Sequence, residues 1–500
     1  MNFCFDNKTV SGCREICRLY ESVQTSVETV VPDTADDMRC VVSVQSRVLL
    51  KGKTLTSSGV CVAGEICAVC ICITEKGEIS HIKTSKEFEM NFETDAVSDE
   101  AQAQIFFTAP LAQGRLINPR KLSMVFETGG VLKVFGGCDT VVDSTLPKDL
   151  CCEGLHLKYD ETEITAQTFT AEKPFVISEQ FPFSGGSPTA TELIWEQCDF
   201  HVNDVQMIGT KAIVRGSLSL TALYCTAESL YPVSREFSSP FSQIIDSGSE
   251  ETEFSSAHIE TTAVYADIQD TINGEKALNV EIHALIELTG CCRRKVRYVS
   301  DLYSNLVCSA CVFEKRSNKS FMPVRTNTFV SNEVVKAPDD CEEIVSVISS
   351  LSQPQISGMT VSAIETLELI YRDIQGELCT ARRSVEIGGS IDEENISILS
   401  SALTDRSVRT DGGRAQVHSV LELTYQSAAS GEISVVAAAE LDDETPFDFS
   451  ALPTVTLVRA ESEDLWEYAK TYHSDVAEIE RLNELEGDIR GRLLLIPKTV

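Results

Sequence analysis

The sequence predicts a mainly β protein, in which three tandem antiparallel β-sandwich or barrel-like domains precede a small βααβ module. Strand-turn-strand units recur along most of the chain, opened by Gly59, Gly209 and Gly358 at intervals of about 150 residues. The segment 454–498 changes to helical spacing of its apolar residues. With 500 residues, the chain is also too long for one hydrophobic core, so several domains are expected.

The second unit has the clearest strand pattern. Its apolar or small residues alternate with polar ones, as in a strand with one buried face: Val214, Gly216, Leu218 and Leu220 against Arg215, Ser217, Ser219 and Thr221. Both faces of the first unit are apolar, so we expect that strand to be buried on both sides. Turn signals and further alternating strands flank each unit, which is typical of a small antiparallel sandwich or barrel.

These patterns divide the chain into five parts. They are an N-terminal segment (1–20), three β repeats (21–148, 165–305 and 322–440) and a terminal module (454–498). Polar stretches at 158–163 and 315–320 are expected to be joints between repeats, and 441–446 a linker into the module. We expect the repeats to form an array rather than one fold.

Composition excludes several classes of function. The formal net charge is −34, from 76 acidic and 42 basic residues, so nucleic acid and anionic membrane are poor partners. The N-terminus has no charged region followed by an apolar run, which predicts no secretory signal. The most apolar stretch, 60–73, is interrupted by Gly64 and Glu65 and is too short to span a bilayer. We therefore expect a cytoplasmic protein without direct membrane insertion.

The terminal module reads as strand, helix, helix, strand. Ser462 or Asp464 can cap the first helix, and Asp475 followed by Glu478 resembles a capping box at the start of the second. A closing strand ends at Pro497, which cannot donate a ladder hydrogen bond. The expected core of the module consists of Leu465, Trp466, Ala469, Ile479, Leu482 and Ile496. Trp466 could instead be an exposed anchor for a sugar or a protein, but its place in the apolar stripe favours the core.

This module resembles the LysM family in D-L-W-E-Y-A-K-T-Y (464–472), V-A-E-I-E-R-L-N (476–483) and G-R-L-L-L-I-P (491–497). Many LysM modules bind N-acetylglucosamine polymers, and some bind proteins. The resemblance implies binding through the two loops, whose candidate residues are Ala460, Glu461, Ser462, Glu463, Asp464, Asn483, Glu484, Glu486, Asp488 and Ile489. Their many carboxylates favour a basic protein surface over a glycan, although these acids could also be a solvated face.

The repeats resemble a second family. P-D-T-A-D-D (32–37), the glycine-opened strand units and D-L-Y-S (301–304) are similar to the SPOCS domain of SipL-like spore-coat morphogenetic proteins, which also end in a LysM module. This resemblance implies a protein of the mother-cell cytoplasm at the forespore surface. It also implies docking on the coat ATPase, stage IV sporulation protein A, through the LysM module, with other coat proteins as further partners.

No catalytic or cofactor-binding pattern emerges from the residues. The seven histidines include no H-E-x-x-H pair, and neither G-x-S-x-G nor a phosphate loop occurs. The 19 cysteines include C-x-x-C pairs at 67/70 and 308/311, but 67–72 reads as an apolar strand in which thiols pack as small hydrophobes. We therefore expect no enzyme, cofactor or metal. The cysteines could still crosslink once conditions become oxidising.

The prediction for function is thus a non-enzymatic scaffold of the spore coat that acts by adhesion, with its strand edges and acidic loops available to partners. The alternative is a cell-wall protein that binds peptidoglycan or N-acetylglucosamine through the LysM groove.

Overall fold

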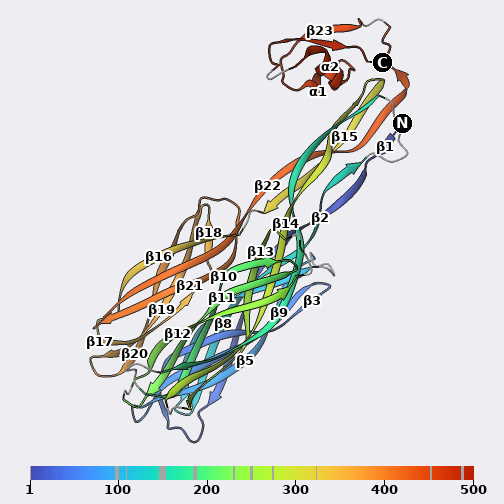
Figure 1. The fold of residues 1–500 in the computed structure, drawn as a ribbon. Coiled ribbons are helices and arrows are strands. Elements are labelled where there is room, and N and C mark those ends of the chain that lie inside the picture. The colour runs from blue at the N-terminus through green and yellow to red at the C-terminus, as the bar shows by residue number, and fades with distance from the viewer. Residues whose placement is uncertain are drawn as a thin grey trace.

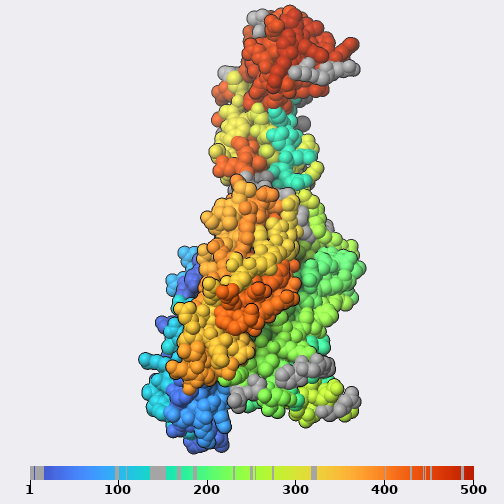
Figure 2. Space-filling model, turned by 90° about the vertical axis from the view of Figure 1, so that its left-hand side faces the viewer, coloured from blue at the N-terminus to red at the C-terminus, as the bar shows by residue number. Residues whose placement is uncertain are grey.

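The computed structural model describes residues 2–95, 101–108, 110–145, 154–183, 189–228, 231–247, 250, 252–272, 275–321, 324–450, 453–485 and 489–499. It confirms a mainly β fold built from antiparallel sheets, with one pair of short helices. A broad body of strands narrows to a stalk that carries the terminal module at its far end (Figure 1). The space-filling view shows the same body, narrow neck and terminal module (Figure 2).

Each repeat is a pair of antiparallel sheets. In repeat 1, one sheet contains β2 (Asp6–Val30), β8 (Lys121–Thr145), β6 (Gln102–Phe107) and β7 (Leu111–Asn118), and the other β3 (Met38–Thr56), β4 (Gly59–Thr74) and β5 (Ile79–Glu93). In repeat 2, the sheets are β9 (Leu155–Pro182), β14 (Lys276–Ser304) and β13 (Phe254–Asp270), and β10 (Ala190–Ile208), β11 (Lys211–Thr226) and β12 (Val233–Asp246).

Repeat 3 follows the same plan. One sheet contains β16 (Arg325–Lys336), β22 (Arg414–Pro446) and β21 (Ile396–Asp411), and the other β17 (Cys341–Leu351), β18 (Gln355–Ser357), β19 (Thr360–Asp373) and β20 (Leu378–Ser390). Apolar side chains from both sheets of repeat 2 form one core, in which Leu218 and Leu220 of β11 meet Ile282 of β14. The period-two alternation predicted for β11 is therefore the inward face of a sandwich.

Two of the three repeated glycines have the same geometric role at a hairpin turn. Gly209 has φ +57° and Gly358 has φ +61°, a left-handed conformation that glycine adopts without a steric penalty. Each stands at the turn that leads into the central strand of its sheet, β11 or β19. Gly59 of repeat 1 differs slightly, because it follows the turn as the first residue of β4 and has φ +149°.

The three repeats share a common centre. Val69 and Ile71 of β4, Trp195 of β10 and Ile370 of β19 belong to one buried apolar cluster to which all three repeats contribute. The expectation of a simple array therefore missed a shared core. This cluster also explains why the second half of β4 is buried on both faces, as its sequence predicted.

The stalk consists of strands that continue out of the body. We define it as Asn2–Phe5, 155–167 of β9, 291–304 of β14, β15 (Val307–Phe321) and 428–446 of β22; β1 (Asn2–Cys4) pairs with β22. Its apolar interior includes Val299, Leu302 and Val436. The polar stretches 158–163, 315–320 and 441–446 are therefore strands and not linkers, because each pairs with a neighbouring stalk strand over this range.

The terminal module has the predicted order of elements: β23 (Val455–Arg459), α1 (Leu465–Thr471), α2 (Val476–Asn483) and β24 (Leu493–Pro497). Asp464 caps α1 by accepting from the Trp466 backbone N–H at 3.0 Å, and Asp475 caps α2. Ala469, Ile479 and Ile496 are buried in its core as predicted, and Leu465 and Trp466 pack against it. Leu482 does not belong to this core, because it lies on the solvent side of α2. Within the described residues, no helix has the length and apolar character needed to cross a membrane.

Candidate functional site: the terminal module on its stalk

Asp301 is the polar centre of the contact between the stalk and the module. Its carboxylate oxygens lie 2.7 and 2.8 Å from the Lys470 ammonium, and the Trp466 indole N–H donates to it at 2.8 Å. Both donors come from α1, whereas Asp301 lies near the end of β14. One carboxylate therefore holds two side chains of the same helix face against the stalk.

Tyr303 brings the stalk into the core of the module. Its buried ring packs edge-to-face with Trp466 at a centroid distance of 4.8 Å and stacks on His156 at the same distance. Its hydroxyl donates to the Ser474 carbonyl at 2.8 Å. Burial raises the pKa of this hydroxyl, in agreement with its role as a donor in an apolar setting. The module and stalk thus share a core instead of being joined by a flexible tether alone.

Charged and aromatic pairs surround this shared core. Lys158 of β9 lies 2.6 Å from Asp464, and this hydrogen bond raises the pKa of the lysine. The His473 ring stacks on Phe447 at 3.7 Å between centroids. All of these contacts involve α1, its cap or the loop between the two helices, so this side of the module faces the stalk.

Trp466 has a role that sequence reasoning assigned only in part. It packs against the module core as predicted, but its indole N–H leaves the module to reach Asp301. It is therefore neither a purely internal residue nor an exposed anchor. The D-L-Y-S motif that contains Asp301 and Tyr303 was recognised in the sequence as a family resemblance, and its contact with Trp466 was not foreseen.

The contact between the module and the stalk is expected to weaken in acid. His156, which faces Asp475 and Tyr303, and His473, which faces Phe447 and the Ser304 backbone, both have their pKa lowered by burial. A lowered pKa means that the undocked state binds more protons. The module is therefore held most tightly on the stalk above the ordinary histidine pKa of about 6.5. The stability of the docked state decreases as the pH drops from there through the lowered pKa that the two histidines have in that state.

Limited proteolysis of the 447–454 connection between about pH 7.5 and about pH 5 measures this effect. A His156→Gln/His473→Gln double variant should lose most of the pH dependence. An equal increase in cleavage for both proteins at low pH would contradict the assignment to these two rings.

The predicted loop residues separate into four groups. Ala460 and Ile489 are buried in the module core and cannot contact a partner directly. Asp464 is committed to Lys158, and Glu463 forms an ion pair with Arg490 at 3.2 Å across the two loops. Glu461 and Glu484 are exposed. Ser462 is partly buried, and its hydroxyl accepts a hydrogen bond from the Asp464 N–H. Glu486 and Asp488 lie outside the described residues.

Asn483 acts on the backbone of the neighbouring strand. Its side-chain amide donates to the Leu495 carbonyl at 2.7 Å and accepts from the Leu495 N–H at 2.7 Å. It also donates to the Ile479 carbonyl at 2.8 Å. Asn483 therefore closes the outer edge of β24 and fixes the end of α2, a structural role that the prediction of a ligand-binding residue did not include.

The outward face of the β23–β24 pair was missed in the sequence. Val455 and Leu457 on β23, with Leu493 and Leu495 on β24, point away from the helices and are between 39% and 62% exposed. The inward residues Leu494 and Ile496 are buried. The apolar run in β24 on both faces was the available signal, since a strand with one solvated face should alternate with polar residues.

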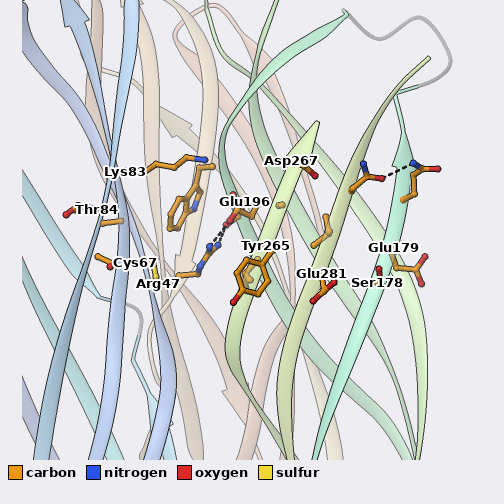
Figure 3. Close-up of a pocket in the computed structure, with 18 residues that line it drawn as sticks. Arg47, Cys67, Lys83, Thr84, Ser178, Glu179, Glu196, Tyr265, Asp267 and Glu281 are labelled. Atoms are coloured by element: carbon orange, nitrogen blue, oxygen red, sulfur yellow. Dashed lines mark hydrogen bonds and ion pairs between the residues drawn. The ribbon is translucent and has the colours of Figure 1, made fainter. Parts of the chain in front are cut away.

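A groove between repeats 1 and 2 is a second candidate site. It has a volume of about 1010 Å³, and its walls come from β3, β4 and β5 on one side and β9, β10, β13 and β14 on the other (Figure 3). Within it, Arg47 binds the Glu196 carboxylate at 2.6 Å and covers the Trp195 ring at 4.6 Å. Because this pair joins two repeats, we assign a structural role to the part of the groove that Arg47, Trp195 and Glu196 line.

A cavity of about 970 Å³ lies among all three repeats. At its lining, Arg406 of repeat 3 lies 3.6 Å from Glu236 of repeat 2 and 3.5 Å from the buried Glu365. Burial lowers the pKa of Arg406, while the two carboxylates oppose that effect. The charges that line this cavity thus connect repeats to one another.

The C-x-x-C pairs do not provide matched metal ligands. Cys67 and Cys70 are three positions apart on the continuous strand β4, and Cys308 and Cys311 are three apart on β15. Side chains at that spacing point to opposite faces of a strand. In the described part of the chain, no group of three or more His, Cys, Asp or Glu side chains is placed to hold a metal ion. Among the cysteines whose side chains the structure describes, Cys308 alone is exposed.

No family model, curated protein or solved structure matches this chain. The comparisons therefore assign neither a family nor an activity.

Proposed function

We propose that this chain is a non-enzymatic scaffold of spore-coat assembly, which docks on a coat ATPase resembling stage IV sporulation protein A through its LysM-like terminal module. The proposal places it in the mother-cell cytoplasm at the forespore surface. It combines the two family resemblances in the sequence with the position of the module. Other coat proteins would then contact the β repeats.

The observation that carries this proposal is the set of contacts that attach the module to the tip of the stalk. The stalk contributes Tyr303 to the module core and Asp301 to its polar contact, so both an apolar and a polar contact orient the module on the stalk. Its β23–β24 face remains exposed at the far end of the molecule from the repeats (Figure 1). Such an arrangement suits a protein that binds one partner through its terminal module and leaves the β repeats available to other proteins.

The alternative is binding of peptidoglycan or N-acetylglucosamine between the two module loops. The Glu463–Arg490 ion pair links those loops, and Ala460 and Ile489 turn inward instead of lining a groove. Asp464 is occupied by the stalk. These contacts favour a protein partner over a glycan.

Removal of the terminal module is expected to abolish recruitment to the developing spore. A chain that ends at residue 450 keeps the repeats and stalk strands but lacks the proposed docking part. Fluorescence microscopy of the tagged full chain and the shortened chain in sporulating cells measures their enrichment at the forespore. Equal enrichment of the two chains would contradict the proposal.

The choice between protein and glycan is tested by capture on two matrices. The full chain should bind immobilised coat ATPase and should not sediment with purified peptidoglycan. Retention on peptidoglycan alone would establish the cell-wall alternative. A shortened chain that binds neither matrix serves as the control for nonspecific adsorption.

A further inference from the structure

The terminal module has one uncovered aliphatic face. Leu457 is 59% exposed and Leu493 is 62% exposed, and Val455 and Leu495 complete a patch of four aliphatic side chains on the outer side of the β23–β24 pair. The helices cover the opposite side through Leu494 and Ile496. A contiguous aliphatic patch on so small a module is a feature of interaction surfaces.

The two edges of this sheet differ. Leu495 uses its N–H and carbonyl to bind Asn483, so both groups point away from β23. Since Leu495 is directly opposite Leu457, the two form a non-hydrogen-bonded pair, and the Leu457 N–H and carbonyl must point to the other edge. In the described residues, no strand pairs with β23 except β24. The β24 edge is thus closed by a side chain, whereas the β23 edge is open.

We propose that this open β23 edge is a strand-addition site, where an extended segment of a partner protein pairs with Val455–Arg459. This inference rests on the proposed function and names the surface by which the module docks. The added strand would satisfy the outward backbone groups of Leu457. It would also lay alternate side chains beside the aliphatic patch.

The side chains of this face specify the occupant. Leu457 and Arg459 lie on the same outward face two positions apart, so they meet partner residues that are also two apart. An aliphatic residue suits the position beside Leu457, and an acidic residue suits the position beside Arg459. The partner segment therefore has an aliphatic and an acidic residue two positions apart. The aliphatic residue comes first if the added strand is parallel to β23, and the acidic residue comes first if it is antiparallel.

Other surfaces of the module are less suitable. The α1 side is occupied by Asp301 and Tyr303 of the stalk, and the β24 edge is occupied by Asn483. The loop carboxylates Glu463 and Asp464 already have cationic partners within the chain. In a chain of net charge −34, an outward patch of aliphatic residues with arginine is chemically distinct from the rest of the surface.

The test uses the full chain and measures its affinity for the purified coat ATPase. Leu457→Asp places a charge in the patch and is expected to weaken binding at least about tenfold, a loss of about 1.4 kcal/mol. Arg459→Glu should also weaken binding, by charge repulsion with the acidic residue of the partner. Leu482→Asp is the matched control, because Leu482 is an exposed leucine of the same module on α2; it should bind within about twofold of the unaltered chain.

Hydrogen exchange gives a second measurement that does not depend on a variant. Strand addition predicts slower exchange of the Leu457 amide when the ATPase is bound. If the unaltered chain binds the ATPase but Leu457→Asp binds equally well and the amide remains unprotected, the strand-addition site is wrong while the scaffold function stands. Failure of the unaltered chain to bind overturns both. Binding of anionic phospholipid vesicles that is lost in Leu457→Asp, without ATPase binding, would instead identify a membrane surface.

Discussion

Replacing Arg47 by alanine is expected to destabilise the assembled repeats by about 3–5 kcal/mol, because it leaves a buried carboxylate without its cationic partner. The Arg47 and Glu196 side chains are only 17% and 8% exposed, and they connect β3 of repeat 1 to β10 of repeat 2. The arginine also donates to the Glu196 backbone carbonyl at 2.6 Å and covers the Trp195 ring. The substitution therefore removes three interactions at one seam.

Urea unfolding followed by Trp195 fluorescence measures this loss, in a Trp466→Phe background that leaves one tryptophan to report on the centre of the repeats. Lys315→Ala is the control: its pair with Glu432 on the stalk is largely exposed and should contribute less than about 1 kcal/mol. Replacing both partners, as Arg47→Met with Glu196→Leu, should recover most of the stability because no buried charge remains. A loss below about 1 kcal/mol for Arg47→Ala would contradict the assigned role.

The strand pattern could be predicted from sequence because it is a local property. The alternation in Val214–Leu220 reports one buried face directly, and the glycines at the repeated turns report a backbone conformation that other residues disfavour. The helices of the terminal module were likewise identified by their caps, and Asp464 and Asp475 both act as the sequence predicted. In these cases, the residues that determine the structure lie close together in the chain.

The long-range contacts could not be predicted in this way. Polar residues at 158–163 resemble a linker in composition, and only pairing with β14 shows that they form the outer face of a stalk strand. Trp195 belongs to a cluster formed by three repeats, which no single repeat reveals. Trp466 and Asp301 are separated by 165 residues, so their hydrogen bond has no local signature.

The candidate binding surface shows the same division. The acidic loops stand out in the sequence because they carry many carboxylates, yet Asp464 and Glu463 are paired within the chain. Leu457 and Leu493 looked like ordinary strand residues, and their exposure depends on which side the helices cover. Tertiary packing decides whether a charge is free or a leucine is covered, so composition alone points to the loops and does not reveal the exposed aliphatic face.

Replacing Asp301 by alanine is expected to release the terminal module from the stalk. The change removes the acceptor of both the Lys470 ammonium and the Trp466 indole, with an expected loss of about 2–4 kcal/mol in docking free energy. Asp301 is 20% exposed and Lys470 is 42% exposed, so water can solvate the released lysine and moderates the cost. Tyr303 would lose its fixed position against Trp466, and the edge of the module core would become hydrated.

Trp466 fluorescence should shift to longer wavelength in this variant, and the 447–454 connection should be cleaved faster by a protease. Asp301→Asn should give an intermediate result, because the amide oxygen can still accept from the indole but carries no charge for Lys470. Glu467→Ala is the matched control on α1: Glu467 is exposed, and its loss should leave both signals unchanged. If Asp301→Ala also left them unchanged, the shared aromatic core around Tyr303 would be sufficient for docking, and the polar contact would not be required.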